Sequence, residues 1–361
     1  MDFGLSEDQK MLQASVTRLL AERAPITQVR KLREQDCRND RAIWGALVDL
    51  GATGILIPDQ HGGSGLTMLD AALVAQALGH AVTPVAYLSA AVMVPIALCA
   101  SKLGADSDWL SGIATGKVLF GVAVTEAFSI REHAGITLQG GKLHGKAMMA
   151  LDCVDADFIL VAVGNHTLAV VARNAVGLEV TKLATVDTTR CTSELLFNDV
   201  TPLAVDEHAS RAIARMLDAG RIALAADALG ACQAMIELAV AYAAQRRQFE
   251  RVIGSFQAVK HMCAEMIAEL EPARSLIWYA AHSFDASPHE APLMASHALA
   301  HVSEIGRHIA ATATQVHGGI GWTDDQNLHF WFKRIGTARH LLGGPELLRE
   351  RAAVLQDLIG A

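Results

Sequence analysis

The hydrophobic period of this sequence changes twice, and that change limits the fold more than any other feature. Up to about residue 117, apolar side chains recur at helical spacing. From about Val118 the segments are short and partly alternating, and after Ala209 the pattern is helical again. We therefore predict an α+β protein of three parts: an N-terminal helical domain (1–117), a middle antiparallel β domain (118–205) and a C-terminal helix-bundle domain (206–361).

Local signals support this division. Ser6 and Gln9 have the spacing of a capping box, so a helix is expected to start there and to run to about Arg23. Gly140-Gly141 and Gly164-Asn165 lie at natural hairpin turns between the alternating segments. Long alanine-rich stretches near the C-terminus have the lengths of bundle helices: 209–246, 257–284 and 293–316.

One stretch has enough apolar residues to cross a bilayer. Residues 71–101 contain no Asp, Glu, Lys or Arg, and a membrane helix needs only about 20 apolar residues. However, Gly79, His80, Pro84 and Pro95 divide the stretch into shorter pieces. We expect two helices buried in a protein core rather than a membrane span.

Charge and cysteine content restrict partners and compartment. The chain has 361 residues and a formal net charge of −8, and no block of five or more like charges occurs, so nucleic acid is not an expected partner. The six cysteines are scattered, which is typical of reduced thiols. The N-terminus MDFGLSEDQK has no basic stretch before an apolar run, so a cytoplasmic location is expected.

Several common catalytic motifs are absent from the sequence. There is no GxGxxG after a strand, no Walker A sequence, no HExxH and no GxSxG elbow. His297 and His301 are spaced to share a ligand on one helix, but the sequence around them shows no convincing metal-ligand spacing. A polar helix face explains this pair, and no metal site is expected.

Two stretches near the C-terminus combine residues suited to a phosphate-bearing ligand. In QVHGGIGWTDDQNLHFWFKR (315–334), glycines follow a helix and allow close backbone approach, although a plain helix cap explains them equally well. In QRRQFERVIGSFQ (245–257), Arg246 and Arg247 offer cationic donors, Phe249 offers a ring, and Gln257 offers an amide.

Together these stretches resemble the C-terminal domain of the acyl-CoA dehydrogenase superfamily, whose members carry FAD. The resemblance covers essentially the whole chain and includes the LSEDQ opening, the P-x-x-x-GG-x-G loop from Pro58 to Gly65, and Thr125-Glu126. In that family the RxxF…Q and QxxGG motifs hold the adenosine and pyrophosphate part of an FAD bound in the neighbouring subunit. The matching positions, which the resemblance implies are cofactor-binding, are Arg246, Phe249, Gln257, Gln315, Gly318 and Gly319.

The family's reaction is α,β-desaturation of an acyl-CoA thioester, and it requires a carboxylate base. A carboxylate removes the α-proton while the β-hydrogen leaves as hydride to the flavin. The family places this Glu either in a YEGT-like segment, where this chain has Leu342, or directly before an Arg that looks like Arg221, where this chain has Gly220. Neither residue can accept a proton. Arg221 is implied to bind substrate near the thioester, with a snorkelling surface arginine as the alternative.

The segments that resemble the flavin-ring cleft also depart from the family pattern. The TEPxAGSD loop becomes Thr125 to Glu132, with Phe128 at the variable position, Ile130 in place of the glycine and Arg131 in place of the serine that faces CoA. Arg131 has an alternative pairing with Glu132 or Asp152, outside any ligand site. The W-[IV]-[ST] strand that stacks on the ring becomes Met149-Ala150-Leu151.

Residues that serve a neighbour's FAD are thus kept, while those that serve the chain's own flavin ring and substrate are lost. The resemblance is closest to the base-lacking subunit of heteromeric α2β2 acyl-CoA dehydrogenases, including those linked to steroid side-chain degradation. It implies a related partner chain with the catalytic Glu, an acyl-CoA substrate and an electron-accepting flavoprotein.

Two alternatives stay open. The first is a homo-oligomeric flavoenzyme with a relocated base, for which Asp218, Glu126 and Glu346 are candidates. Asp218 lies two residues before Gly220, about 200° around a helix, so it is expected to point elsewhere. The second is a non-catalytic scaffold or binding protein, in which Leu342 and Met149 are ordinary core residues.

Overall fold

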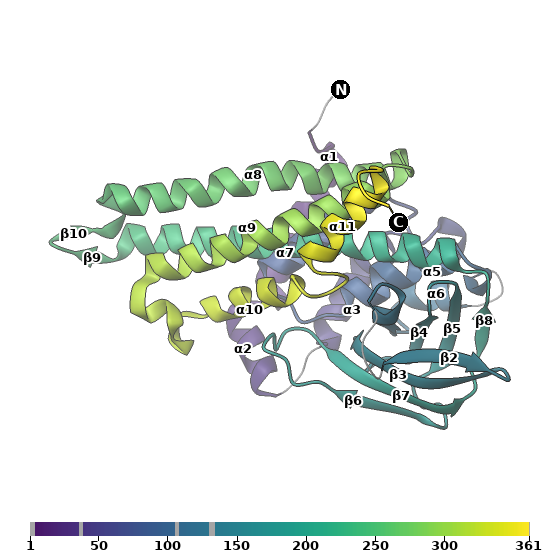
Figure 1. Cartoon of the computed structure of the whole chain (residues 1–361). Coiled ribbons are helices and arrows are strands. Elements are labelled where there is room, and N and C mark those ends of the chain that lie inside the picture. Colours follow the sequence, from purple (N-terminus) through teal and green to yellow (C-terminus); the bar gives the residue numbers. More distant parts are fainter. Residues whose placement is uncertain (1–3, 36–38, 105–107, 130–133, 361) are drawn as a thin grey trace. The chain divides into compact units, whose positions relative to one another are not determined.

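The computed structural model describes residues 4–35, 39–104, 108–129 and 134–360 (Figure 1). By its internal contacts the chain divides into two compact units. The first comprises Met1–Arg30, Ala72–Thr83 and Arg221–Ala361, and the second comprises Lys31–Ala71 and Pro84–Gly220. Along the sequence, the order is a helical part, a β-sheet part and a second helical part, as the hydrophobic period predicts.

The N-terminal part is helical, and its first helix begins where the capping box predicts. The Ser6 hydroxyl accepts from the Gln9 backbone N–H, and the Gln9 side-chain oxygen accepts from the Ser6 N–H. The helices of this part are α1 (Glu7–Arg23), α2 (Ile26–Glu34), α3 (Arg41–Asp49), α4 (Met68–His80), α5 (Val94–Cys99) and α6 (Trp109–Ala114).

The uncharged stretch 71–101 forms two buried helical segments, as expected. Helix α4 ends at His80, and a π-helical segment, Tyr87–Met93, leads directly into α5. Among the described residues, one helix is long and apolar enough to cross a membrane by length and composition, and it is α7 (Ser210–Gln245). In its most apolar window 83% of the residues are buried inside the protein, as in a core helix.

The middle part is a twisted sheet in the second unit. Its strands are β1 (Phe120–Ala123), β2 (Gly135–Gln139), β3 (Lys142–Leu151), β4 (Phe158–Val163), β5 (Thr167–Ala172), β6 (Leu178–Lys182), β7 (Thr192–Val200) and β8 (Ala204–Asp206). The strand order is β6-β7-β3-β1-β4-β5-β8, with β2 paired to β3. Both predicted hairpin turns are present, Gly140-Gly141 between β2 and β3 and Gly164-Asn165 between β4 and β5.

The prediction of an antiparallel sheet is wrong for one strand pair. Strands β1 and β4 pair in parallel, Phe120 opposite Phe158 through Ala123 opposite Val161. Strand β3 runs antiparallel to β1, and the chain then reverses to form β4 on the other side of β1. Two reversals restore the original direction, so β1 lies between β3 and β4 and is parallel to β4.

The C-terminal part consists of helices, of which the first three are long and lie where the alanine-rich stretches predict. They are α7 (Ser210–Gln245), α8 (Gln257–Ala286), α9 (Ala291–His317), α10 (Leu328–Ala338) and α11 (Pro345–Leu355). Helix α9 packs against α8, α10 and α11. Between α7 and α8 the chain forms a short hairpin of β9 (Arg247–Gln248) and β10 (Arg251–Val252), which extends beyond the helix ends in Figure 1.

Helices α4 and α7 cross at backbone contact in the first unit. A Cβ placed on Gly79 would lie 1.9 Å from the Asp227 carbonyl oxygen, and one placed on Gly230 would lie 1.9 Å from that of Gln76. Reciprocal glycines on the two helices therefore permit an approach that any side chain would block.

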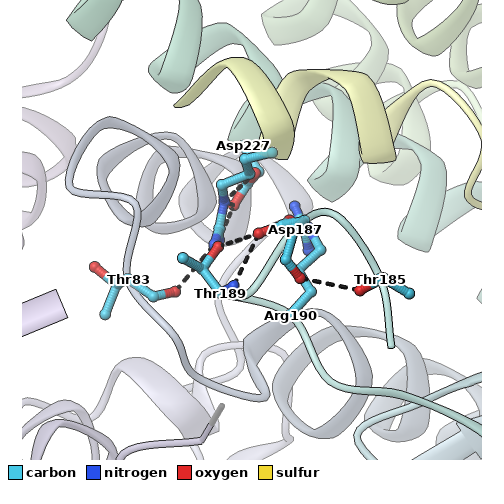
Figure 2. Close-up of polar contacts among 7 residues, drawn as sticks. Thr83, Thr185, Asp187, Thr189, Arg190 and Asp227 are labelled. Carbon is cyan, nitrogen blue, oxygen red and sulfur yellow. Dashed lines mark hydrogen bonds and ion pairs between the residues drawn. The ribbon is translucent and has the colours of Figure 1, made fainter. Parts of the chain in front are cut away.

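A buried ion pair lies at the same crossing. Arg334 of α10 donates from Nε to Asp227 Oδ1 at 2.9 Å and from Nη2 to Asp227 Oδ2 at 2.6 Å, and its Nη1 donates to the Thr83 carbonyl oxygen at 3.2 Å. Figure 2 labels Thr83 and Asp227 among the polar contacts of this region. Arg334 is only 3% exposed, so both charges are compensated inside the protein.

We expect Gly230→Ala to destabilise the protein by at least about 1–3 kcal/mol, because the new methyl group must push two backbones apart. Gly336→Ala in α10 is the matched control, since a Cβ there meets nothing within 4 Å. The control should be stabilising by about 0.5–1 kcal/mol from helix propensity. Chemical denaturation of both variants checks this, and equal stabilities would show that the crossing is not tight.

Candidate functional site

The two motif-bearing stretches of the C-terminal part meet at one end of the helix bundle. The rings of Tyr242 and His317 are stacked with centroids 4.5 Å apart, so the last turn of α7 packs against the last residue of α9. Arg246 follows Tyr242 by one helical turn, and Gln315 and Gly318 flank His317. Arg246 and Gln315 are about 70 residues apart in the sequence, and the fold brings them to the same end of the helix bundle.

The β9–β10 hairpin presents Phe249 to solvent at a cost in backbone energy. Phe249 and Glu250 form its turn, with φ values of 50° and 64°. A turn with two positive φ values favours Asn-Gly, and each other residue there costs about 1–3 kcal/mol. Arg247 Nη2 donates to the Glu250 carbonyl oxygen at 2.6 Å and holds the turn. The Phe249 side chain is nevertheless 86% exposed, and its ring lies edge-on to that of Phe256 with the centroids 6.1 Å apart.

The polar groups of this end also face outward. Arg246, Gln257 and Gln315 are exposed, and their side chains make no hydrogen bond or ion pair with any described residue. Arg246 therefore has an open guanidinium, which suits a diphosphate.

Gly318 and Gly319 have different explanations. Gly318 has a φ of 67° and donates its N–H to the Gln315 carbonyl oxygen, so it ends α9 as a plain cap would. Gly319 does not have a positive φ, and a Cβ there would meet nothing within 4 Å. Nothing inside the described chain requires a glycine at 319.

The position that resembles the family's YEGT base holds a buried apolar residue. Leu342 is 4% exposed and has a φ of 55°. Its carbonyl oxygen accepts from Arg221 Nε at 3.0 Å. Arg221 is 3% exposed, so the alternative of a snorkelling surface arginine is wrong. In this structure the guanidinium of Arg221 holds the backbone of the Leu342 segment.

The three alternative bases are occupied or buried. Glu346 forms an ion pair with Arg339 at 3.0 Å at the start of α11. Glu126 Oε1 accepts from the Met148 backbone N–H at 3.0 Å. Asp218 lies in α7 and is 3% exposed, while Gly220, two residues on, has no side chain to act as a base.

The segments that resemble the flavin-ring cleft lie in the second unit. Thr125 is buried in a short 3-10 helix, Thr125–Ala127. Met149 lies at an irregularity of β3 and has a φ of 55°, so the strand bends where the family has its aromatic residue. Ile130, Arg131 and Glu132 lie outside the described residues.

One contact near the site had no signal in the sequence. Arg30 of α2 donates from Nη1 to Asp324 Oδ2 at 2.5 Å and from Nη2 to Asn327 Oδ1 at 2.7 Å. These two hydrogen bonds from one guanidinium hold in place the loop that follows the glycine-rich turn Gly318–Trp322. In the described part of the chain, no group of three or more His, Cys, Asp or Glu side chains could hold a metal ion, and that includes the surroundings of His297 and His301.

Comparison with known proteins identifies the class. Residues 6–117 match the N-terminal domain of acyl-CoA dehydrogenases, and residues 210–354 match their C-terminal domain. The chain belongs to the acyl-CoA dehydrogenase family of oxidoreductases.

Three individual proteins show how similar the chain is to known sequences and structures of this family. Acyl-CoA dehydrogenase IpdE2 of Mycobacterium tuberculosis is 30% identical over 345 residues, which are 95% of this chain and 96% of that protein. The solved ChsE4-ChsE5 complex from the same organism contains a chain that is 25% identical, with a TM-score of 0.91 and full coverage of both chains. A chain of the solved Tcur3481-Tcur3483 steroid ACAD has a TM-score of 0.88 and 24% identity over 98% of each chain, which shows the fold alone.

The His317 ring next to this site gives the protein a pH dependence that can be measured. Burial lowers the pKa of His317 from its usual value, and the hydrogen bond from Nδ1 to the Ala313 carbonyl oxygen opposes this. The unfolded chain therefore takes up the proton first as the pH falls below about 6.5. The contribution of His317 to stability is present above that pH and is lost as the pH falls through the lower pKa of the folded state.

We expect the stability difference between the wild type and His317→Gln to shrink as the pH falls from about 8 to about 5, because only the wild type titrates at this position. Thermal unfolding of both proteins across this range measures the difference. Curves that stay parallel would show that His317 has the same pKa in the folded and unfolded chains.

Proposed function

We propose that this chain is the subunit of a heteromeric, FAD-dependent acyl-CoA dehydrogenase that lacks the catalytic carboxylate and completes the FAD site of a partner chain. The observation that carries the proposal is the contrast between two places in the first unit. At the end of the bundle, Arg246 and Phe249 face outward without partners for the guanidinium, whereas at the base position Leu342 is buried and its carbonyl oxygen is bound by Arg221.

The outward-facing residues fit the adenosine and diphosphate half of FAD. Arg246 offers a charged donor to the diphosphate, Phe249 offers a ring to the adenine, and Gly319 leaves room for close approach of the chain's backbone. Gln257 and Gln315 offer amide groups that can both donate and accept. FAD, when bound, supplies the hydride acceptor of the desaturation.

The partner is proposed to supply what this chain lacks. A related chain with a glutamate before its counterpart of Arg221, or in a YEGT-like segment, would remove the α-proton of the acyl-CoA substrate. The two-chain names of the ChsE4-ChsE5 and Tcur3481-Tcur3483 structures support a heteromer, and the second name supports a steroid-derived acyl group. An electron-accepting flavoprotein would reoxidise the FAD.

We further propose three domains for this chain: residues 1–117, 118–205 and 206–361.

A homo-oligomeric enzyme with a relocated base is less well supported. Such a base needs a carboxylate that is open to substrate. Glu346 is bound to Arg339, and Glu126 is bound to the backbone of β3. The turn at Phe249 is strained and leaves the side chain 86% exposed, which favours a binding role over a scaffold without flavin.

Arg246→Ala is expected to lower the FAD content of the co-purified complex, because a charge-assisted hydrogen bond to phosphate contributes about 1.5–3 kcal/mol, or more than tenfold in affinity. Arg211→Ala, which removes an exposed arginine from the first turn of α7, is the control. Flavin absorbance per complex after dialysis measures the effect. Equal FAD retention by both variants would remove Arg246 from the cofactor site.

Leu342→Glu in the chain alone is expected to produce no acyl-CoA oxidation, because the positions that resemble the ring-stacking strand stay Met149-Ala150-Leu151. A dye-reduction assay with acyl-CoA measures this, and thermal unfolding checks that the variant is folded. Appreciable turnover by this variant would mean that the chain lacks only its base.

A further inference from the structure

The first unit contains a cleft whose lining includes none of the residues proposed to bind FAD. It has a volume of about 970 Å³ and lies among α1, α4, α7, α8 and α10. Clefts of about 300–1,000 Å³ are typical of sites for small organic molecules. The chemistry of its lining therefore decides what it could bind.

The lining is cationic in a protein that is acidic overall. Lys10, Arg18 and Arg274 line the cleft, and Glu237 is the only carboxylate among the lining residues, whereas the whole chain has a formal net charge of −8. Glu237 is already bound, since its Oε2 lies 2.8 Å from His80 Nε2 and its Oε1 accepts from Gln233 Nε2 at 2.9 Å. The remaining charge favours an anion.

Arg18 is the open donor of this cleft. Lys10 forms an ion pair with Glu7 at 2.8 Å, and Arg274 forms one with Glu271 at 3.0 Å. Arg18 is exposed, and its guanidinium makes no hydrogen bond or ion pair with any described residue. A guanidinium presents a planar pair of N–H groups that matches a carboxylate.

Two of the chain's five tryptophans line the same cleft. Trp278 Nε1 donates to Gln76 Oε1 at 3.4 Å, and Trp331 Nε1 donates to the His80 carbonyl oxygen at 2.8 Å. Because both indole N–H groups are bound inside the protein, the rings are fixed in orientation. What they offer to a ligand is apolar ring surface, which suits another flat ring.

We propose that this cleft is a second binding site, for a small organic anion with a carboxylate on a flat aromatic body. Arg18 binds the carboxylate, and Trp278 packs against the ring. The site is independent of the proposed FAD half-site, because the two share no residue.

The test uses 2-naphthoate as the probe and the full-length chain. Isothermal titration calorimetry should show saturable binding, with quenching of tryptophan fluorescence over the same concentrations. Arg18→Gln should weaken binding about tenfold, the loss of one charge-assisted contact. Arg23→Gln removes an exposed arginine from the same helix outside the cleft and should leave binding unchanged. The uncharged 2-naphthamide should bind as weakly to the wild type as 2-naphthoate binds to Arg18→Gln.

Three results would overturn the proposal. They are no saturable binding of 2-naphthoate, equal binding by the wild type and Arg18→Gln, and equal affinities of the wild type for 2-naphthoate and 2-naphthamide. Thermal unfolding of each variant confirms that a loss of binding is not a loss of fold. FAD content is the separate readout for the half-site, so failure here leaves that proposal standing.

Discussion

The buried pair of Arg334 and Asp227 is the interaction on which the rest of the first unit depends. It joins α10 to α7 at the point where Gly230 lets α4 cross at backbone contact. Removing one partner of such a pair leaves a buried charge and costs about 3–5 kcal/mol. The packing of α4, α7 and α10 against one another therefore depends on both side chains. The pair therefore gives the bundle one arrangement rather than a family of similar ones.

A rigid bundle explains how an exposed site can hold a defined geometry. Helix α7 continues from Asp227 to Tyr242, whose ring stacks on His317, and the strained turn at Phe249 follows directly. A side chain that is 86% exposed has few contacts of its own to orient it. Its position comes from the end of α7 and from the turn that Arg247 holds. Such a fixed position is what the proposed FAD half-site requires.

The sequence predicted the type of each part because hydrophobic period is a local property. It did not predict the parallel β1–β4 pairing or the pair of Arg334 and Asp227, which depend on residues far apart in the chain. The two-residue strands β9 and β10 are too short to show a period. The candidate cofactor residues were proposed from resemblance to a family and not from a physical pattern. The burial of Arg221 could not be read from an alanine-rich helix.

We propose that this chain completes an FAD site on a partner and does not hold FAD by itself. The most direct measurement is the visible flavin absorbance of the chain purified alone, expressed as FAD per chain, and compared with the chain purified together with its partner. The account predicts little or no FAD on the chain alone and bound FAD in the complex. About one FAD per chain on the isolated protein would contradict it and would favour a self-sufficient flavoenzyme.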